Sequence, residues 1–266
     1  MNSRGQAVYG HFGEWIQGRL GAAGEIVLIT LHCRALSVEA DSRASGQGGS
    51  QMFSKEQLAG FRREIGIGDT PWPQLTSNIP LGCGAGASTT TLVALARGAG
   101  FAGPPMQLAQ ACHRVEGASD PLMWPEPDGV IWASRNCRVH STTSPPPRCS
   151  ILGGYWGAPQ PTDPSDMRFP DVSDLIEKWR AASLARNLPE LARLATLSAT
   201  RCTKLRGPSD PMKILAQQLG ALGVVRAHTG SARGLIFRAG EVPMSASSVL
   251  LAAGLTGVFE FETGAA

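Results

Sequence analysis

The feature that most constrains this chain is a glycine-rich loop that runs directly into a helical segment. Gly82, Gly84 and Gly86 alternate with other residues after Pro80, and residues 88–97 carry apolar side chains at helical spacing. Glycines let a backbone turn sharply and approach a ligand closely. The first amide groups of the helix then point into the loop with the positive end of the helix dipole. That arrangement is typical of a phosphate site.

Two interpretations of this loop stay open from its residues alone. Ser88, Thr89, Thr90 and Thr91 offer hydroxyl groups to phosphate oxygens or to Mg²⁺. Alternatively, the loop is a plain turn in which Ser88 or Thr89 caps the helix. The lysine of a Walker A loop is missing, and the glycines do not follow the GxGxxG pattern. Neither a P-loop nucleotidase nor a Rossmann dinucleotide site is therefore indicated.

The composition places the chain among globular proteins that can bury a large core. It has 266 residues, 42% of them hydrophobic, and a formal net charge of +3 with scattered basic residues, so no nucleic acid partner is expected. No segment approaches 18 apolar residues and the first ten contain no apolar signal core, which predicts a cytoplasmic protein without a membrane partner. Six cysteines without a CxxC pair predict buried free thiols.

Strand and helix patterns interleave without a strict βαβ rhythm, which favours an α+β fold. Asn187 followed by Glu190 predicts a helix cap, and the run SPPPR at 144–148 predicts a boundary between two lobes, residues 1–147 and 148–266. The predicted strands lie at 25–31, 34–40, 74–79, 129–133, 223–227, 234–238 and 257–261. The predicted helices lie at 88–97, 107–115, 172–186, 189–202, 211–219 and 246–253, and a loop is predicted at 41–50.

Three motifs, in this chain order, resemble those of the GHMP kinases, a superfamily that includes galactokinase, homoserine kinase and mevalonate kinase. The stretch IPLGCGAGAST is similar to the phosphate loop P-x-G-x-G-L-G-S-S-A, with Ala85 in place of the usual leucine and Ala87 in place of the first serine. The stretches GHFGEWIQGRL at 10–20 and VVRAHTGSARGLIF at 224–237 resemble signatures of the L-threonine kinase branch of cobalamin synthesis. Phe12 stands where the first signature has cysteine.

The resemblance implies a fold, cofactors and a substrate class. The fold would combine an N-terminal lobe like the ribosomal S5 domain 2 with a ferredoxin-like C-terminal lobe. ATP and Mg²⁺ would be the cofactors, and the acceptor would be a small hydroxylated amino acid, with L-threonine as the leading candidate. The residues expected to hold the ATP phosphates are Pro80, Gly82, Gly84, Ala85, Gly86, Ala87, Ser88 and Thr89.

Two acidic residues beyond the loop complete the catalytic set that the resemblance implies. Glu116 would bind Mg²⁺ together with Ser88, and Asp120 would lie near the acceptor hydroxyl, either as a base or as an orienting group. The competing interpretations are structural. Glu116 is also explained as a solvated charge at a helix end, and Asp120 as a turn former before Pro121.

The first and third motifs supply the residues expected to bind the acceptor, which are Glu14, Gln17, His228, Thr229, Gly230 and Ser231. The Glu14 carboxylate either pairs with the α-ammonium group of an amino acid or makes a structural hydrogen bond. His228 alone is also explained as a structural histidine. Arg226 and Arg233 either counter phosphate charge or are solvated. The remaining histidines, His11, His32, His113 and His140, have no sequence context that suggests a role.

Other functions compete with an amino acid kinase. The chain could phosphorylate another small hydroxylated metabolite, or bind a nucleotide or metabolite without turnover. Cys83, Ala87 and the extra residue between Glu116 and Asp120 motivate the latter hypothesis. Neither GxSxG nor HExxH is present, so a hydrolase is not indicated. A scaffold does not require three glycine-rich loops, and no motif defines the oligomeric state.

Overall fold

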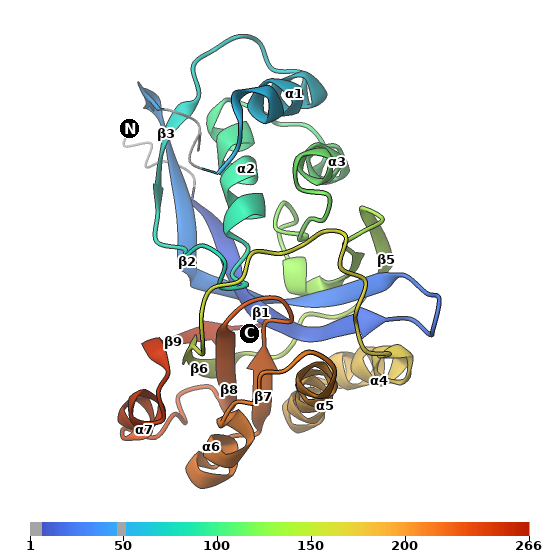
Figure 1. Cartoon of the computed structure of the whole chain (residues 1–266), viewed down its shortest axis with the longest axis vertical. Coiled ribbons are helices and arrows are strands. Elements are labelled where there is room, and N and C mark those ends of the chain that lie inside the picture. The colour runs from blue at the N-terminus through green and yellow to red at the C-terminus, as the bar shows by residue number, and fades with distance from the viewer. Residues whose placement is uncertain (1–6, 47–51, 266) are drawn as a thin grey trace.

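The computed structural model describes residues 7–46 and 52–265. Figure 1 shows an elongated molecule with helices in both its upper and its lower half. The strands are β1 (Ala7–Arg19), β2 (Ile26–Ser45), β3 (Pro73–Ser77), β4 (Val130–Ala133), β5 (Arg138–Thr142), β6 (Cys149–Tyr155), β7 (Gly223–Arg226), β8 (Ala232–Arg238) and β9 (Thr256–Thr263). The helices are α1 (Lys55–Ile65), α2 (Ala87–Gly98), α3 (Pro105–Glu116), α4 (Ser173–Leu184), α5 (Leu188–Arg206), α6 (Met212–Leu219) and α7 (Ala246–Ala252), with a 3₁₀ turn at Pro127–Gly129.

The nine strands form one antiparallel sheet that runs through both halves. Its order is β5-β4-β2-β1-β7-β8-β6-β9, and β3 pairs with the outer part of β2. The two halves of the sheet meet where Glu14 of β1 pairs with Arg226 of β7. This junction brings the first and third motifs side by side, although about 200 residues separate them in the sequence.

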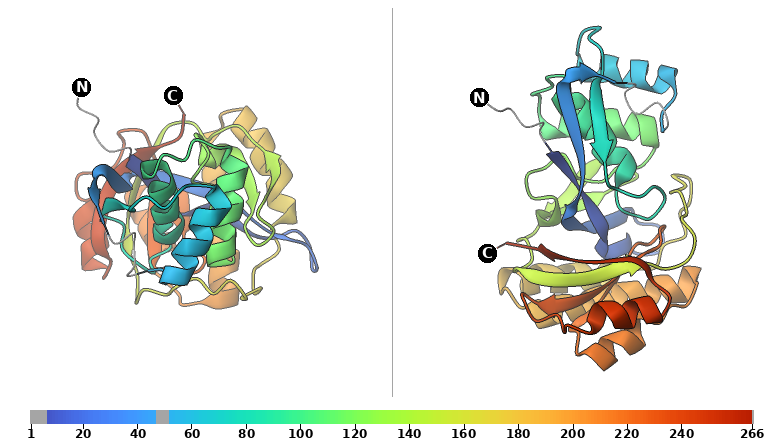
Figure 2. Two further views of the ribbon diagram at one scale, coloured as in Figure 1. Left: turned by 90° about the horizontal axis from the view of Figure 1, so that it is seen from above. Right: turned by 90° about the vertical axis from the view of Figure 1, so that its left-hand side faces the viewer.

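Helices cover the sheet differently in the two halves. The helix α2 packs on β1 and β2, and α1 and α3 lie beside it in the upper half. In the lower half α6 and α7 pack against β6, β7, β8 and β9, and α4 and α5 lie beneath β1 (Figure 2). The mixture of an antiparallel sheet with interleaved helices confirms the predicted α+β class.

Phe12 anchors one part of the core between the halves. Its ring contacts those of Tyr155, Phe259 and Phe261, with centroids 5.8, 5.2 and 5.6 Å away. The side chain is fully buried, and aromatic pairs in these tilted geometries stabilise a core beyond the area that they bury. The phenylalanine that departs from the L-threonine kinase signature therefore ties β1 to the C-terminal half.

Several strand predictions were wrong. The two strands predicted at 25–31 and 34–40 form one long strand, β2, which continues through Ser45 where a loop was predicted. Residues Asp41 and Ser45 gain ladder partners in Gln74 and Pro73 of β3, so tertiary pairing overrides their loop-like composition. The rest of the predicted loop, 47–50, lies outside the described residues.

Four elements carried no prediction: β1, α1, β5 and β6. The strand β1 lacks a clear alternation of polar and apolar residues because it is buried on both faces and its register shifts between Tyr9 and Gly10 and again on both sides of Glu14. Period-2 patterns identify only half-buried, regular strands. The period-2 pattern therefore did not identify β1, the strand that carries the first motif.

The predictions of the helix cap and of the free cysteines agree with the structure. The amide of Glu190 donates to the Asn187 side chain at 3.2 Å, so Asn187 caps α5. The other half of the capping box is replaced, because the Glu190 carboxylate pairs with Arg193 at 2.6 Å. All six cysteines are free, and every one except the half-buried Cys137 is buried. None of the helices described is long and apolar enough to cross a membrane. The lobe boundary at 147/148 stays a prediction.

Candidate active site

The glycine-rich loop has the geometry of an anion site. Gly82, Gly84 and Gly86 have φ values of 70°, 72° and 72°, a left-handed backbone conformation that residues other than glycine rarely adopt. Gly86 is the N-cap of α2, and no side chain bonds to the first amides of the helix. Neither Ser88 nor Thr89 acts as the cap, so the amides face the cavity in front of the loop.

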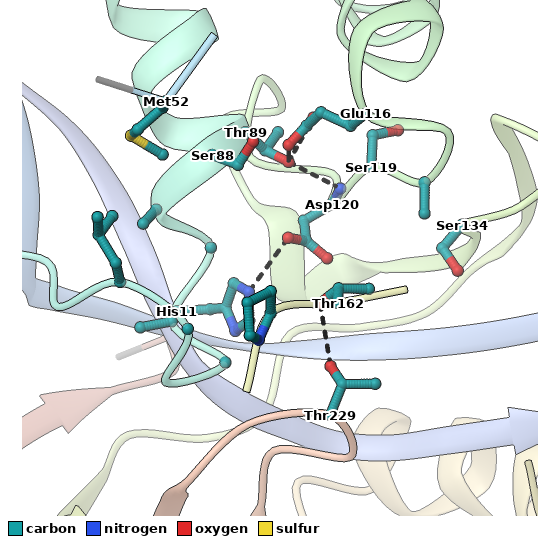
Figure 3. A pocket seen from close by; sticks show the side chains of 18 of the residues that line it. His11, Met52, Ser88, Thr89, Glu116, Ser119, Asp120, Ser134, Thr162 and Thr229 are labelled. Carbon is teal, nitrogen blue, oxygen red and sulfur yellow. Dashed lines mark hydrogen bonds and ion pairs between the residues drawn. The ribbon is translucent and has the colours of Figure 1, made fainter. Parts of the chain in front are cut away.

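The four hydroxyls after the loop have different roles. Thr90 and Thr91 donate to the carbonyls of Gly86 and Ala87, both at 2.7 Å, so their hydroxyls belong to the helix. The hypothesis that all four hydroxyls face a ligand is therefore wrong for these two. Thr89 and Ser88 turn towards the carboxyl group of Glu116 instead (Figure 3).

Glu116 and Asp120 meet at this hydroxyl pair. Thr89 Oγ1 donates to Glu116 Oε2 at 2.9 Å and accepts the amide of Asp120 at 3.4 Å. Removal from bulk water raises the pKa of Glu116 to about 8, against the hydroxyls of Ser88 and Thr89, which favour its charged form. Glu116 is thus a cavity carboxyl group and not the solvated helix-end charge of the competing interpretation.

His11 is a site residue that the sequence analysis missed. It is 3% exposed, with Nε2 3.2 Å from Asp120 Oδ2 and Nδ1 3.2 Å from the Gly13 carbonyl. Both neighbours only accept hydrogen bonds, so both ring nitrogens must donate and the ring must be cationic. Burial lowers the pKa of His11, but Asp120, Glu14 and the Gly13 carbonyl outweigh burial and raise it to about 9. Its only sequence signal was its place within the first motif.

The acceptor side of the cavity carries a negative and a positive group. Glu14 is buried on β1, where its Oε2 accepts the amide of His228 at 3.3 Å while the carboxylate also lines the cavity. Nearby, Gln17 Oε1 is buried without a hydrogen-bond partner. Arg135, which the sequence analysis also missed, lines the same cavity, and its Nε has no partner. It is a lone arginine after a short strand, so no motif marked it.

Residues of the third motif line two different cavities: the main cavity, which the glycine-rich loop and Glu116 also line, and a smaller one. Thr229 reaches the main cavity, where its hydroxyl lies 3.1 Å from that of Thr162 (Figure 3). His228, Gly230 and Ser231 do not line that cavity; they line a smaller one of about 150 Å³ behind it. His228 Nδ1 lies 3.6 Å from Glu14 Oε2, so this histidine supports Glu14 from behind the main cavity.

The main cavity has a volume of about 440 Å³, and its lining residues come from both halves of the molecule, from Ser88 of α2 to Thr229 between β7 and β8. The predicted site residues on its wall are Glu14, Gln17, Pro80, Gly82, Gly84, Ala85, Gly86, Ala87, Ser88, Thr89, Glu116, Asp120 and Thr229. An apolar end is formed by Met52, Phe53, Leu81 and Val115. The cavity therefore combines apolar side chains, the glycine-rich loop and charged groups on one wall.

The donor set fits magnesium better than a transition metal. No group of three or more His, Cys, Asp or Glu side chains that could hold a metal ion occurs in the described part of the chain. Mg²⁺ is usually held by one or two carboxylates together with substrate phosphates, and not by a cage made of protein alone. Glu116, with the Ser88 hydroxyl beside it, is such a partial site.

Comparisons with known proteins identify the fold that holds this site. A scan against protein-family models and a search of curated proteins gave no match. Among solved structures, phosphomevalonate kinase from Streptococcus pneumoniae is similar with a TM-score of 0.63, 12% identity, and coverage of 98% of this chain and 100% of that one. Homoserine kinase from Cytophaga hutchinsonii is similar with a TM-score of 0.57, 14% identity, and coverage of 100% and 96%. The chain has the GHMP kinase fold.

The GHMP kinase fold does not by itself fix the reaction. Mevalonate diphosphate decarboxylase from Staphylococcus aureus is also similar, with a TM-score of 0.61, 8% identity, and coverage of 99% of this chain and 96% of that one. Function is carried by the groups in a site and not by the fold that holds them. In this chain, the candidates for such groups are the glycine-rich loop, Glu116, the His11–Asp120 pair, Glu14 and Arg135.

Proposed function

We propose that this protein is an ATP- and Mg²⁺-dependent kinase that phosphorylates the side-chain hydroxyl of a small amino acid, with L-threonine as the leading acceptor. The observation that carries the proposal is a single cavity that joins an uncapped helix start with two carboxyl groups. The free amides of α2 face the position of a phosphate, while Glu116 and Asp120 lie on its other side. Phosphoryl transfer needs this combination of positioning and charge neutralisation.

The cavity has matching places for both parts of ATP. The phosphates would lie on the loop from Gly82 to Thr89, where the helix dipole and the backbone amides favour negative charge. The adenine ring would lie at the apolar end, against Met52, Leu81 and Val115. When bound by Glu116 and Ser88, Mg²⁺ would neutralise phosphate charge.

The charged side chains of Glu14 and Arg135 in the main cavity favour an amino acid as the acceptor. Glu14 and the orphaned Gln17 carbonyl are acceptor-only groups that suit an α-ammonium group. Arg135 offers a guanidinium for the carboxylate, and Asp120 on the wall of the same cavity would meet the side-chain hydroxyl. A hydroxylated metabolite without an amino group would gain no ion pair with the Glu14 carboxylate, whose Oε2 already accepts the His228 amide.

Asp120 and His11 act as a unit in this proposal. Asp120 would accept the proton of the acceptor hydroxyl or hold that hydroxyl in line with the transferred phosphoryl group. His11, buried beneath it, donates to Asp120 Oδ2 and restrains that carboxylate. The positive ring also reduces the electrostatic cost of placing a carboxylate close to the phosphates.

A screen of small hydroxylated acceptors with ATP and Mg²⁺, read by phosphorus NMR, tests the proposal. We expect a phosphomonoester with L-threonine and little with hydroxy acids that lack the amino group. Glu14→Gln should weaken threonine binding by about 1.5–3 kcal/mol while ATP affinity barely changes. Glu39→Gln, an exposed carboxylate outside the cavity, is the matched control.

Other outcomes of the screen would redirect the proposal. Transfer to a different hydroxylated metabolite would keep the kinase and remove threonine. Nucleotide binding without transfer to any acceptor would support the binding protein without turnover that Ala87 motivates. Equal discrimination for the amino group by the wild type and Glu14→Gln would place the ammonium contact elsewhere.

A further inference from the structure

The smaller cavity behind the third motif is unusually basic. It has a volume of about 150 Å³ and is lined by Arg168, Arg206, Arg226 and Arg233, together with the third-motif residues His228, Gly230 and Ser231. Arg226 and Arg233 are buried, with 4% and 2% exposed surface. Guanidinium groups suit the recognition of phosphate-like anions because their donors form a planar fork.

The cavity has more positive than negative charge. Asp210 lies 2.8 Å from Arg233 and 4.0 Å from Arg226, so two guanidinium groups share this carboxylate. Asp166 pairs with Arg206 at 2.6 Å, while Arg168 has no ion-pair partner among the described residues. Four guanidinium groups therefore share two carboxylates, which leaves two positive charges to be balanced.

A buried hydroxyl adds an independent sign of a missing ligand. Ser231 is 2% exposed and its Oγ has no hydrogen-bond partner. Buried polar atoms are normally hydrogen-bonded, so an orphan that lines a polar cavity indicates a partner from outside the chain. The hydroxyl can donate to an anion oxygen alongside the guanidinium groups.

A wall separates this cavity from the main one. The Phe169 ring, 5% exposed, contacts both Arg135 of the main cavity and Arg206 of the basic cavity, with its centroid 5.5 and 5.2 Å from their guanidinium carbons. Backbone bonds from Gln160 to Gly82, at 2.7 Å, and from Ala232 to Cys83, at 2.9 Å, close the wall beside the phosphate loop. Gln160 lines both cavities and forms part of the wall between them.

We propose that the basic cavity is a second anion site, which binds one free oxyanion of the phosphate class separately from the nucleotide phosphates. Two unbalanced positive charges match a phosphate dianion, and the orphaned Ser231 hydroxyl supplies a neutral donor. The site does not depend on the proposed kinase activity, because none of its guanidinium groups lines the main cavity.

The experiment measures binding of inorganic phosphate by calorimetry at constant ionic strength in a buffer without other oxyanions. The background variant is Ser88→Asp, in which a carboxylate at the start of α2 repels phosphate from the glycine-rich loop. We expect one phosphate to bind in this background. Arg168→Gln, at an exposed guanidinium, should weaken binding about tenfold or more, and Ser231→Ala should weaken it several-fold.

Arg201→Gln is the matched control, because Arg201 is on the same α5 helix as Arg206 but pairs with Asp174 outside the cavity. It should leave phosphate binding unchanged at this ionic strength. Thermal melting of each variant checks that the fold is kept. Equal weakening by Arg201→Gln and Arg168→Gln, or no binding by the Ser88→Asp background, would overturn the proposal.

A final arm distinguishes a free anion from the anionic end of an acceptor. The titration is repeated with saturating L-threonine and with a non-hydrolysable ATP analogue. Unchanged phosphate binding supports a separate site, and it does so even if threonine is not phosphorylated. Competition by threonine would instead show that the basic cavity belongs to the acceptor site, and would refute the separate oxyanion site.

Discussion

At the residue scale, Glu116 links burial to metal binding. Its pKa is raised to about 8, mainly by removal from water, so the carboxyl group keeps its proton at neutral pH when no cation is present. A metal ligand must lose that proton. Burial thus keeps the carboxyl group neutral at pH 7 until a cation binds, and it makes cation binding depend on pH.

We predict that Mg²⁺ affinity, measured by calorimetry in the presence of a nucleotide, falls about tenfold per pH unit below pH 8. Glu116→Gln should bind Mg²⁺ more weakly and lose that pH dependence, because the amide has no proton to release. Its size is conserved, so the melting temperature should change little. A pH dependence that persists in the variant would remove Glu116 from the metal site.

His11 gives a second prediction at the residue scale, with stability as the readout. Its pKa is raised to about 9 by Asp120 and Glu14, against burial. The protonated ring therefore stabilises the fold fully below pH 6.5, and this contribution is lost as the pH rises through 9. Urea unfolding of the wild type and His11→Gln should show a difference that shrinks from pH 6.5 to 9. A difference independent of pH would contradict the ion pair with Asp120.

At the scale of elements, the loop between β7 and β8 supports the phosphate loop from behind. A Cβ atom added to Gly230 would overlap the backbone of Cys83 and Gly84, although the φ of Gly230 is not positive. Glycine is needed here for close approach and not for an unusual backbone conformation. The third motif thus helps to fix the shape of the first anion site.

We predict that Gly230→Ala destabilises the protein by about 1–3 kcal/mol, as overpacking does, and weakens nucleotide binding by displacing the phosphate loop. Chemical unfolding and a nucleotide titration measure the two effects. Gly60→Ala is the control, because its Cβ meets only the far end of Arg63 in α1. Alanine should stabilise that helix by about 0.5–1 kcal/mol. Unchanged nucleotide affinity in Gly230→Ala would mean that the loops are independent.

At the scale of the whole molecule, the two halves share one sheet and one core. The largest cluster of buried apolar side chains contains Leu92 from the upper half and Leu191 from the lower half, joined through β1. Trp15 of β1 packs on Trp179 of α4, with ring centroids 5.6 Å apart. Melting one half would expose apolar surface of the other, which couples their unfolding.

We therefore predict a single calorimetric transition, with equal calorimetric and van't Hoff enthalpies. A fragment of residues 1–147 should not fold alone, because it would leave the β7 edge of β1 and the Phe12 side chain uncovered. ATP with Mg²⁺ at a hundred times its dissociation constant should add about 2.7 kcal/mol to the same transition. Two resolved transitions would show that the lobes fold independently.

The sequence alone determined the parts of the site that depend on local chemistry. Alternating glycines before a helix indicated an anion loop, because left-handed φ values and free helix amides are local properties. The alternative of a capped turn stayed open until the structure showed that no side chain caps α2. The three motifs likewise led to the GHMP kinase fold, and Asn187 was identified as a cap from two residues. These inferences needed no knowledge of distant contacts.

Only the tertiary structure decided which distant groups meet. The His11–Asp120 pair joins residues 109 positions apart, and the place of His11 in the first motif did not by itself suggest this partner. Arg135 entered the main cavity for the same reason, while Thr229 and Ser231, two residues apart, ended in different cavities. The sequence of β1 shows no alternation of polar and apolar residues, because both faces of the strand are buried and its register shifts. Burial, pairing and partition between cavities are set by long-range packing, which a local pattern does not contain.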